Sequence, residues 1–204
     1  MLTKKSIMCS TSQKELRMKR ILFLTVTGIM LLSFVCPIAR AQKKRIQVGD
    51  TMPGFFLKDI RGESFFLKDY IGEKAKFKHK AMIFSLSASW CKPCKKEIPE
   101  LGKMTEKYKE KGLGIFIIAL EKEENARDLI KETQTKIPVL LDRYLMVPKL
   151  LGQQGIPFTL LVDDKGIVRY INTGFSEENA AQFIERFENA VTAVLGIDDD
   201  GTSE

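Results

Sequence analysis

Histidine and cysteine are scarce in this sequence, which holds one histidine, His79, and four cysteines among 204 residues. Two of the cysteines, Cys9 and Cys36, stand within the first 41 residues, and the other two, Cys91 and Cys94, are three positions apart. A framework of several structural disulfides is excluded by count if the N-terminal segment is removed. A structural zinc site needs four Cys or His ligands, and beyond residue 41 only His79 would be left to join the cysteine pair.

An excess of positive charge is also missing from most of the chain, although the formal net charge is +7. Residues 1–41 hold seven of the 33 Lys and Arg and one of the 26 Asp and Glu, which leaves 26 against 25. The positive charge therefore belongs to the N-terminal segment. It does not predict a nucleic-acid partner, which would require a basic patch on the folded domain.

One long apolar run is present, from Ile21 to Ile38, between two basic residues and the small-residue triplet at 39–41. This order is typical of a secretory signal peptide, cleaved here after Ala41. The run has 18 residues without a charge, the short end of the spanning range, so an uncleaved membrane anchor is the alternative. Met18 begins a signal peptide of ordinary length by itself, and we predict that it is the true start; a long basic lead is the alternative.

Residues 42–197 are predicted to form one α/β domain, followed by an acidic, disordered tail at 198–204. The expected strands are a hairpin at 55–57 and 64–67, buried strands at 81–87 and 114–120, a short strand at 139–141, and a second hairpin at 158–162 and 167–171. The expected helices run from the cysteines to Gly112, over 124–133 and 147–151, and from about 176 to 195. There is no internal repeat.

The segment Trp90-Cys91-Lys92-Pro93-Cys94 joins the buried strand 81–87 to an amphipathic helix. Two cysteines at this spacing form a redox motif, because the first thiol lies at the helix N-terminus, where the helix dipole and free N–H groups favour its thiolate. Cys91 is therefore predicted to be the nucleophile. Cys94, one turn later, is predicted to resolve the mixed disulfide that Cys91 forms with a substrate.

The two residues between the cysteines are predicted to tune the site. Pro93 fixes φ in the first helical turn, where no N–H partner is lost, and Lys92 adds positive charge that favours the thiolate. The alternative for Lys92, and for Lys95 and Lys96 nearby, is a solvated helix start. His79 is predicted to be a plain surface residue, and no metal or other cofactor is expected beyond the redox-active disulfide.

These motifs resemble the thioredoxin superfamily: Trp90 to Cys94, then Pro99, then Ile156-Pro157 ahead of a β-hairpin. Within it, residues 52–55, 66–70 and 95–99 resemble the TlpA/ResA-type proteins, which are exported, often membrane-tethered oxidoreductases that reduce disulfides outside the cytoplasm. The resemblance covers about Val48 to Leu195. It implies a thioredoxin-like fold, with a central mixed sheet flanked by helices and an extra N-terminal β-hairpin.

The resemblance also implies roles for further residues. Pro157 would be the cis-proline that faces the cysteines, Ile156 would bind a substrate strand through its backbone, and Trp90 would cover the disulfide. Plain packing is an equal alternative for Trp90. Glu97 would relay the proton of Cys94 if burial raises its pKa, and the alternative is a solvated helix charge.

Two departures stand out from the same resemblance. Ser85 stands where thioredoxin has a buried Asp, so proton handling must come from elsewhere, which favours Glu97. Phe158 follows the proline where the family usually has Thr, and it is expected to reshape the substrate groove.

The expected activity is the reduction of disulfides in exported proteins outside the cytoplasm, with a membrane electron donor that regenerates the dithiol. Three alternatives stay open: a disulfide-forming oxidant of the same fold, a peroxiredoxin-like peroxidase and a non-catalytic protein-binding module. A peroxiredoxin would need Thr or Ser three residues, and Pro seven residues, before its reactive cysteine. Ala88 and Phe84 occupy those places.

Overall fold

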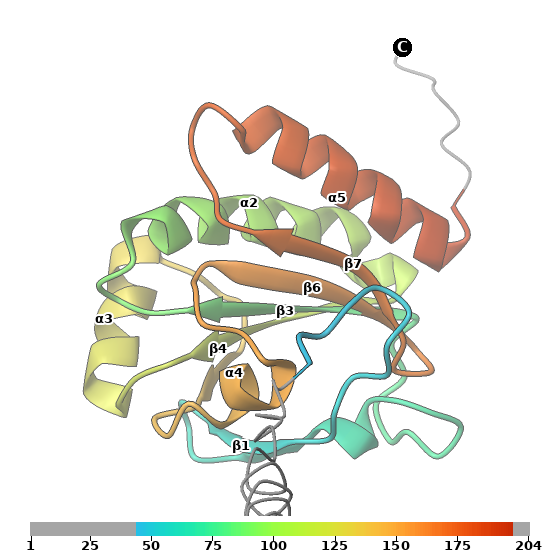
Figure 1. The fold of residues 1–204 in the computed structure, drawn as a ribbon, viewed down its shortest axis with the longest axis horizontal. Helices are drawn as coiled ribbons and strands as arrows, with labels where there is room; N and C mark the ends of the chain where they lie inside the picture. Colours follow the sequence, from blue (N-terminus) through green and yellow to red (C-terminus); the bar gives the residue numbers. More distant parts are fainter. Residues whose placement is uncertain (1–43, 198–204) are drawn as a thin grey trace, which may run out of the picture. The chain divides into compact units, whose positions relative to one another are not determined.

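The computed structural model describes residues 44–197 (Figure 1). The predicted signal peptide or anchor at 1–41, the first residues of the predicted domain and the predicted acidic tail at 198–204 lie outside the described residues. Within the described range, no helix has the length and apolar content that crossing a membrane requires.

A seven-stranded sheet forms the centre of the domain, in the order β2-β1-β5-β4-β3-β6-β7. Strands β3, β4 and β5 are parallel to one another, and the other pairs are antiparallel, so the sheet is mixed as predicted. The strands are β1 (Phe56–Asp59), β2 (Ser64–Phe66), β3 (Ala81–Ser87), β4 (Leu113–Ala119), β5 (Val139–Leu141), β6 (Phe158–Asp163) and β7 (Val168–Thr173).

Within residues 44–197, four α-helices and two short 3-10 turns cover this sheet (Figure 1). The helices are α2 (Lys92–Tyr108), α3 (Glu123–Thr133), α4 (Met146–Leu151) and α5 (Ala180–Leu195), and the turns are η1 (Leu67–Asp69) and η2 (Lys109–Lys111). Helix α2 leads through η2 to Gly112, whose φ of 104° lies in the left-handed region that glycine adopts readily.

The central strands β3, β4 and β6 are buried on both faces, which explains why they are mostly apolar, although β3 also holds Ser85 and Ser87. Because side chains alternate along a strand, Ile83 and Ile115 face the layer of α2, α3 and α5, whereas Phe84 and Phe116 face α4 and the β1–β2 hairpin. The apolar stripe of α5 repeats every four residues and packs on the first layer. It consists of Phe183, Phe187, Val191 and Leu195.

Most element boundaries agree with the sequence prediction, but α5 begins at Ala180, four residues later than expected. The reason is a local turn in which the backbone N–H of Ser176 donates to Asn179 Oδ1, and the N–H of Asn179 donates to Ser176 Oγ. Such side-chain bonds compete with helical bonds in the first turn. The N-terminal hairpin is not a separate appendage, because β1 pairs with β5.

The parallel strands end together at one edge of the sheet. Ser87 of β3 pairs with Ala119 of β4, which pairs with Leu141 of β5, so these residues form one row across the three strands. In Figure 1, β3 runs toward the left of the view, where its loop leads into α2. The loops after β3, β4 and β5 therefore share this edge; Cys91 ends the first of them, and Cys94 lies in the first turn of α2.

Candidate active site

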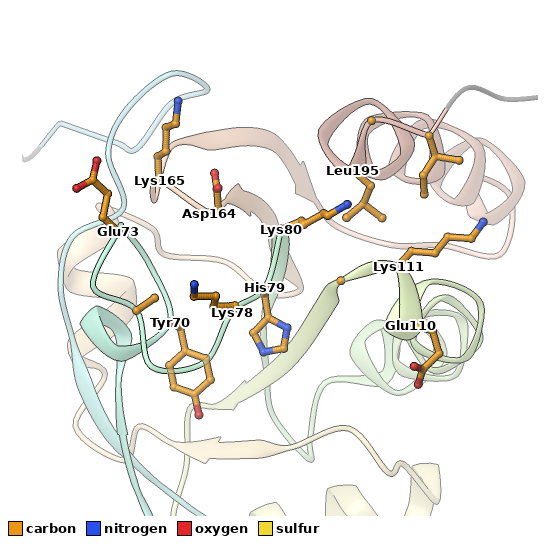
Figure 2. Close-up of a pocket in the computed structure, with 15 residues that line it drawn as sticks. Tyr70, Glu73, Lys78, His79, Lys80, Glu110, Lys111, Asp164, Lys165 and Leu195 are labelled. Atoms are coloured by element: carbon orange, nitrogen blue, oxygen red, sulfur yellow. The ribbon is translucent and has the colours of Figure 1, made fainter.

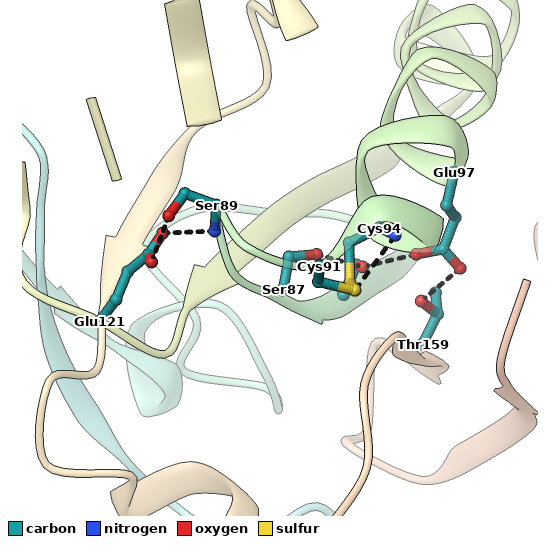
Figure 3. Close-up of a disulfide and its surroundings, with 8 residues drawn as sticks. Ser87, Ser89, Cys91, Cys94, Glu97, Glu121 and Thr159 are labelled. Atoms are coloured by element: carbon teal, nitrogen blue, oxygen red, sulfur yellow. Dashed lines mark hydrogen bonds between the residues drawn. A yellow bond between two sulfur atoms is a disulfide. The ribbon is translucent and has the colours of Figure 1, made fainter. Parts of the chain in front are cut away.

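Cys91 and Cys94 are joined by a disulfide at this edge, with their Cα atoms 5.3 Å apart (Figure 3). Cys91 is the N-cap of α2, and its Sγ accepts a hydrogen bond of 3.2 Å from the backbone N–H of Cys94. A thiolate at this position would face the free N–H groups and the positive end of the helix dipole. The structure therefore places Cys91 where a lowered thiol pKa is expected.

The residues between and after the cysteines differ in their exposure and in their ion pairs. Lys92 and Pro93 are exposed, and Pro93 stands in the first turn of α2, where a missing N–H costs nothing. Lys95 and Lys96, by contrast, form ion pairs with Glu132 and Glu177. Their charge is thus partly neutralised by surface partners, and Lys92 is the lysine of this segment without such a partner among residues 44–197.

The two cysteines differ in their access to solvent. Cys94 is fully buried and Cys91 retains 4% exposure, and both pack against Ala88 and Ile156. Trp90, immediately before Cys91, is 71% exposed, so plain core packing is wrong for this residue. A substrate would therefore meet Trp90 and Cys91 before it could reach Cys94.

The Ile156–Pro157 peptide bond is cis, and Ile156 packs on the cysteine cluster. Phe158 does not reach the surface, since it is buried in the core between the sheet and α4. The expectation that Phe158 reshapes the substrate groove is therefore wrong: as the first residue of β6, it points to the face opposite Thr159.

Glu97 is fully buried one turn after Cys94, so the alternative of a solvated helix charge is wrong. Its carboxylate accepts hydrogen bonds from Thr159 Oγ1 at 2.8 Å and from Ser85 Oγ at 3.0 Å (Figure 3). Burial raises the pKa of Glu97 to about 7, and the two hydroxyl groups oppose this shift. A carboxyl group in this range can hold or accept a proton near neutral pH.

Ser85 extends this buried polar group, because its hydroxyl lies 3.3 Å from Ser87 Oγ. Both serines belong to β3, where the sequence shows only an apolar run interrupted by two small residues. The position at which thioredoxin carries an Asp thus holds a donor to Glu97. The buried carboxyl group of this site therefore lies on α2, at Glu97, and not on β3.

A second buried carboxylate, Glu121, holds the loop that carries the cysteines. It follows β4, is 8% exposed, and accepts two hydrogen bonds from Ser89, one from the backbone N–H and one from Oγ, both at 2.8 Å (Figure 3). Glu121 was not identified from the sequence, because it is one of several charged residues around the start of α3. The only feature that could have indicated its role is its position two residues after the end of β4, at the same edge of the sheet as the loop before Cys91.

A cavity of about 880 Å³ lies apart from this site (Figure 2). It is lined by Lys80 and Gly112, which precede β3 and β4, and so lies at the opposite edge of the sheet. His79 lines it too, half-buried with its ring parallel to that of Tyr70, and is not the plain surface residue predicted. Across residues 44–197, no three His, Cys, Asp or Glu are grouped to hold a metal.

Comparisons with known proteins agree with this geometry. Residues 48–171 match the AhpC/TSA family. The chain is 29% identical to the thiol-disulfide oxidoreductase ResA of Bacillus cereus over 150 residues, which are 72% of this chain and 82% of that protein. It is 32% identical to ResA of Bacillus anthracis over 131 residues, 63% of this chain and 70% of that protein.

Solved structures show the same fold. A crystal structure assigned to a thiol:disulfide interchange protein DsbE from Chlorobium tepidum superimposes with a TM-score of 0.64 and 28% identity, over 74% of this chain and 99% of that one. The thioredoxin domain of a thiol-disulfide oxidoreductase from Bacteroides vulgatus gives a TM-score of 0.58 and 25% identity, over 70% and 98%. The fold is therefore thioredoxin-like.

Proposed function

The chain belongs to the AhpC/TSA family and is a thioredoxin-like thiol-disulfide oxidoreductase, and we propose that it works as a reductant of disulfides in exported proteins. The observation that carries the exchange chemistry is the placement of the two cysteines, with Cys91 at the N-cap of α2 and Cys94 fully buried in its first turn. Such a pair attacks through its outer thiol and resolves through its inner one.

The proposed reaction has two exchange steps. The Cys91 thiolate attacks one sulfur of a substrate disulfide, forms a mixed disulfide and releases the other substrate sulfur as a thiolate. Cys94, deprotonated, then attacks Cys91 Sγ and releases the second substrate thiolate. Two electrons pass to the substrate, and the Cys91–Cys94 disulfide forms.

Glu97 is proposed to take the proton that Cys94 loses in the second step. It lies one turn along α2 from Cys94, inside the protein, where water cannot easily serve as the acceptor. Because burial raises its pKa to about 7, Glu97 is present in both its protonated and its ionised form near neutral pH, so it can accept a proton and release it again. Trp90, Ile156 and Pro157 are proposed to contact the substrate, and Lys92 and Pro93 to tune the potential.

The direction of electron flow is supported by the resemblance to the TlpA/ResA-type reductases and by the relatives named ResA. The predicted signal peptide or anchor supports an extracytoplasmic site of action, where a membrane donor would regenerate the dithiol. A periplasmic protein released after Ala41 and a protein tethered by residues 21–38 are the two forms of this proposal.

The direction is tested by the redox equilibrium of the purified protein in glutathione buffers, followed by Trp90 fluorescence. Strong disulfide oxidants and thioredoxin differ in potential by about 150 mV, which is roughly 7 kcal/mol for two electrons. A potential near or below that of thioredoxin, about −270 mV, is the expected result. A value near about −120 mV would show that the protein forms disulfides and would overturn the reducing direction.

A further inference from the structure

The edge of the sheet that carries the cysteines also exposes a second apolar group, on the loop between β5 and α4. Tyr144 is 69% exposed and Leu145 is 43% exposed, although both are large and apolar. Isolated exposed apolar residues are common, but these two adjoin each other and share an edge with Trp90, which is 71% exposed.

The sheet register sets the distance between the strand ends from which the two loops start. Ser87 and Leu141 stand in one row, two strands apart, which places them about 10 Å from each other. Trp90 follows Ser87 by three residues, and Tyr144 follows Leu141 by three residues. An extended peptide advances about 3.3 Å per residue, so about three residues of a bound segment reach from one group to the other.

The backbone holds Leu145 in this exposed position at a conformational cost. Its φ is 55°, in the left-handed region that is unfavourable for a bulky side chain, and it is one of two non-glycine residues with positive φ among residues 44–197. Asp142 fixes the loop, because its carboxylate accepts hydrogen bonds from the N–H groups of Met146 and Val147 at 2.8 and 2.7 Å. The loop is thus a formed surface and not a loose connection.

Basic side chains surround the exposed apolar groups. Lys122 follows β4, between the other two loops, and Arg143 stacks its guanidinium on the Tyr144 ring, 4.4 Å from the centroid. Lys149 donates to the carbonyl oxygen of Tyr144. Across the described range, these three cations and Lys92 have no carboxylate oxygen within 4 Å.

The acidic residues nearest in sequence cancel most of this charge. Glu123, in the first turn of α3, is bound by Arg127. Glu121, Glu124 and Asp142 have no Lys or Arg nitrogen within 4 Å across the described range. Three carboxylates therefore stand against the four cations, and the rim of the loops after β3, β4 and β5 keeps an excess of one positive charge next to two exposed apolar groups.

We propose that Lys122, Arg143, Tyr144 and Leu145 form a docking surface, continuous with Trp90, for the stretch of a protein substrate that flanks its disulfide. The occupant is an extended segment with an aromatic or large aliphatic residue about three positions from the attacked cysteine and an acidic residue between them. The apolar residue packs on Tyr144 and Leu145, and the acidic residue faces Lys122. This proposal rests on the proposed function and names the class of protein substrate that the reductant takes.

The test compares two peptides and one small disulfide as oxidants of the reduced full chain. Each peptide holds one cysteine as its mixed disulfide with glutathione. In one peptide, Phe stands three positions before and three positions after the cysteine, with an Asp between the cysteine and each Phe. The other peptide has Ser in place of each Phe and Lys in place of each Asp. Bis(2-hydroxyethyl) disulfide, which is neutral and too small to span the surface, reports the exchange chemistry alone. The readout is each peptide's rate constant divided by that of the small disulfide.

Wild-type protein is expected to favour the Phe/Asp peptide by about tenfold or more, a change that corresponds to partial burial of one large side chain. The double variant Tyr144→Ser/Leu145→Asn loses this preference, and Asn tolerates the left-handed backbone. Lys122→Glu, a single surface change that does not depend on the loop, shifts the preference toward the Lys peptide. Circular dichroism checks that each variant is folded.

Two matched controls come from the opposite edge of the sheet. Val48 is 60% exposed and lies beside Gly49, whose N–H donates to Val168 at the start of β7, and Lys80 precedes β3. Val48→Ser and Lys80→Glu are expected to leave the peptide ratios unchanged. If the wild type exchanges with the peptides and with the small disulfide but the surface variants keep its ratios, the docking surface is wrong. If the wild type exchanges with none of the three, the proposed function fails and the surface fails with it.

Discussion

Thr159 Oγ1 donates a hydrogen bond of 2.8 Å to Oε1 of Glu97, so that β6, directly after the cis-proline, and α2, which carries the cysteines, share one buried carboxylate. The bond ties the proposed substrate-binding strand to the proposed proton acceptor. Loss of this hydrogen bond is therefore expected to alter the pKa of Glu97.

The roles of the two cysteines are separated by single substitutions. Cys94→Ser leaves the outer thiol able to attack but removes the resolving one, so we expect a stable mixed disulfide with a substrate. Cys91→Ser removes the nucleophile and is expected to abolish exchange. Mass spectrometry without reductant measures both outcomes. Accumulation of the mixed disulfide in Cys91→Ser instead would reverse the assignment.

Glu97 is expected to make the protein less stable as pH rises. Burial raises its pKa from 4.5 to about 7, so between these values the folded state holds a proton that the unfolded state has lost. The free energy of unfolding therefore falls across this window, by roughly 3 kcal/mol in total. Glu97→Gln cannot titrate and should lose this slope.

Urea unfolding of the oxidised protein at about pH 5 and about pH 8 measures this effect. The substituted protein is expected to be more stable than the wild type at the higher pH. Glu100→Gln serves as the control, because Glu100 is a partly exposed carboxylate on the same helix that pairs with Lys103. An equal pH slope in Glu97→Gln and wild type would contradict a buried carboxyl group with a raised pKa.

Thr159→Val is expected to move the pH dependence of the second exchange step to higher pH. The Thr159 hydroxyl lowers the pKa of Glu97, so its loss lets burial raise that pKa further above 7. Release of product from a preformed mixed disulfide, followed by stopped flow across pH, measures the midpoint. Thr159→Ser keeps a hydroxyl and should behave as the wild type, whereas in Glu97→Gln the midpoint near 7 disappears. An unchanged midpoint in Thr159→Val would separate Glu97 from this step.

Glu121 is expected to act as a positioning residue for the cysteine loop. In Glu121→Ala, the N–H and hydroxyl of Ser89 lose their acceptor, which should cost about 1–3 kcal/mol of stability. The exchange rate of Cys91 should fall as well, and Glu121→Gln, which keeps one acceptor oxygen, should recover part of it. Glu124→Ala, an exposed change in the next helix, is the control. A loss of stability with an unchanged rate would show that the clamp is structural only.

Features that depend on local spacing could be predicted before the structure was known. The pair Cys91 and Cys94 at a strand-to-helix junction predicts the redox chemistry, because the helix N-terminus is fixed by neighbours in the chain. The apolar runs of β3 and β4 predict a sheet covered on both faces, and their alternation with helices predicts parallel pairing. The α/β class and the proposed nucleophile therefore follow from short-range patterns along the chain, whereas the thioredoxin-like fold was implied by the resemblance of its motifs to that superfamily.

The contacts between polar groups inside the domain could not be predicted in this way. Glu97 is bonded to Ser85 and Thr159, 12 and 62 positions away, and Glu121 is bonded to Ser89 across 32 positions. Such partners follow from sheet register and from the packing of a helix on it, which no short pattern encodes. Burial, and with it the raised pKa of Glu97, exists only once the core has closed around these groups.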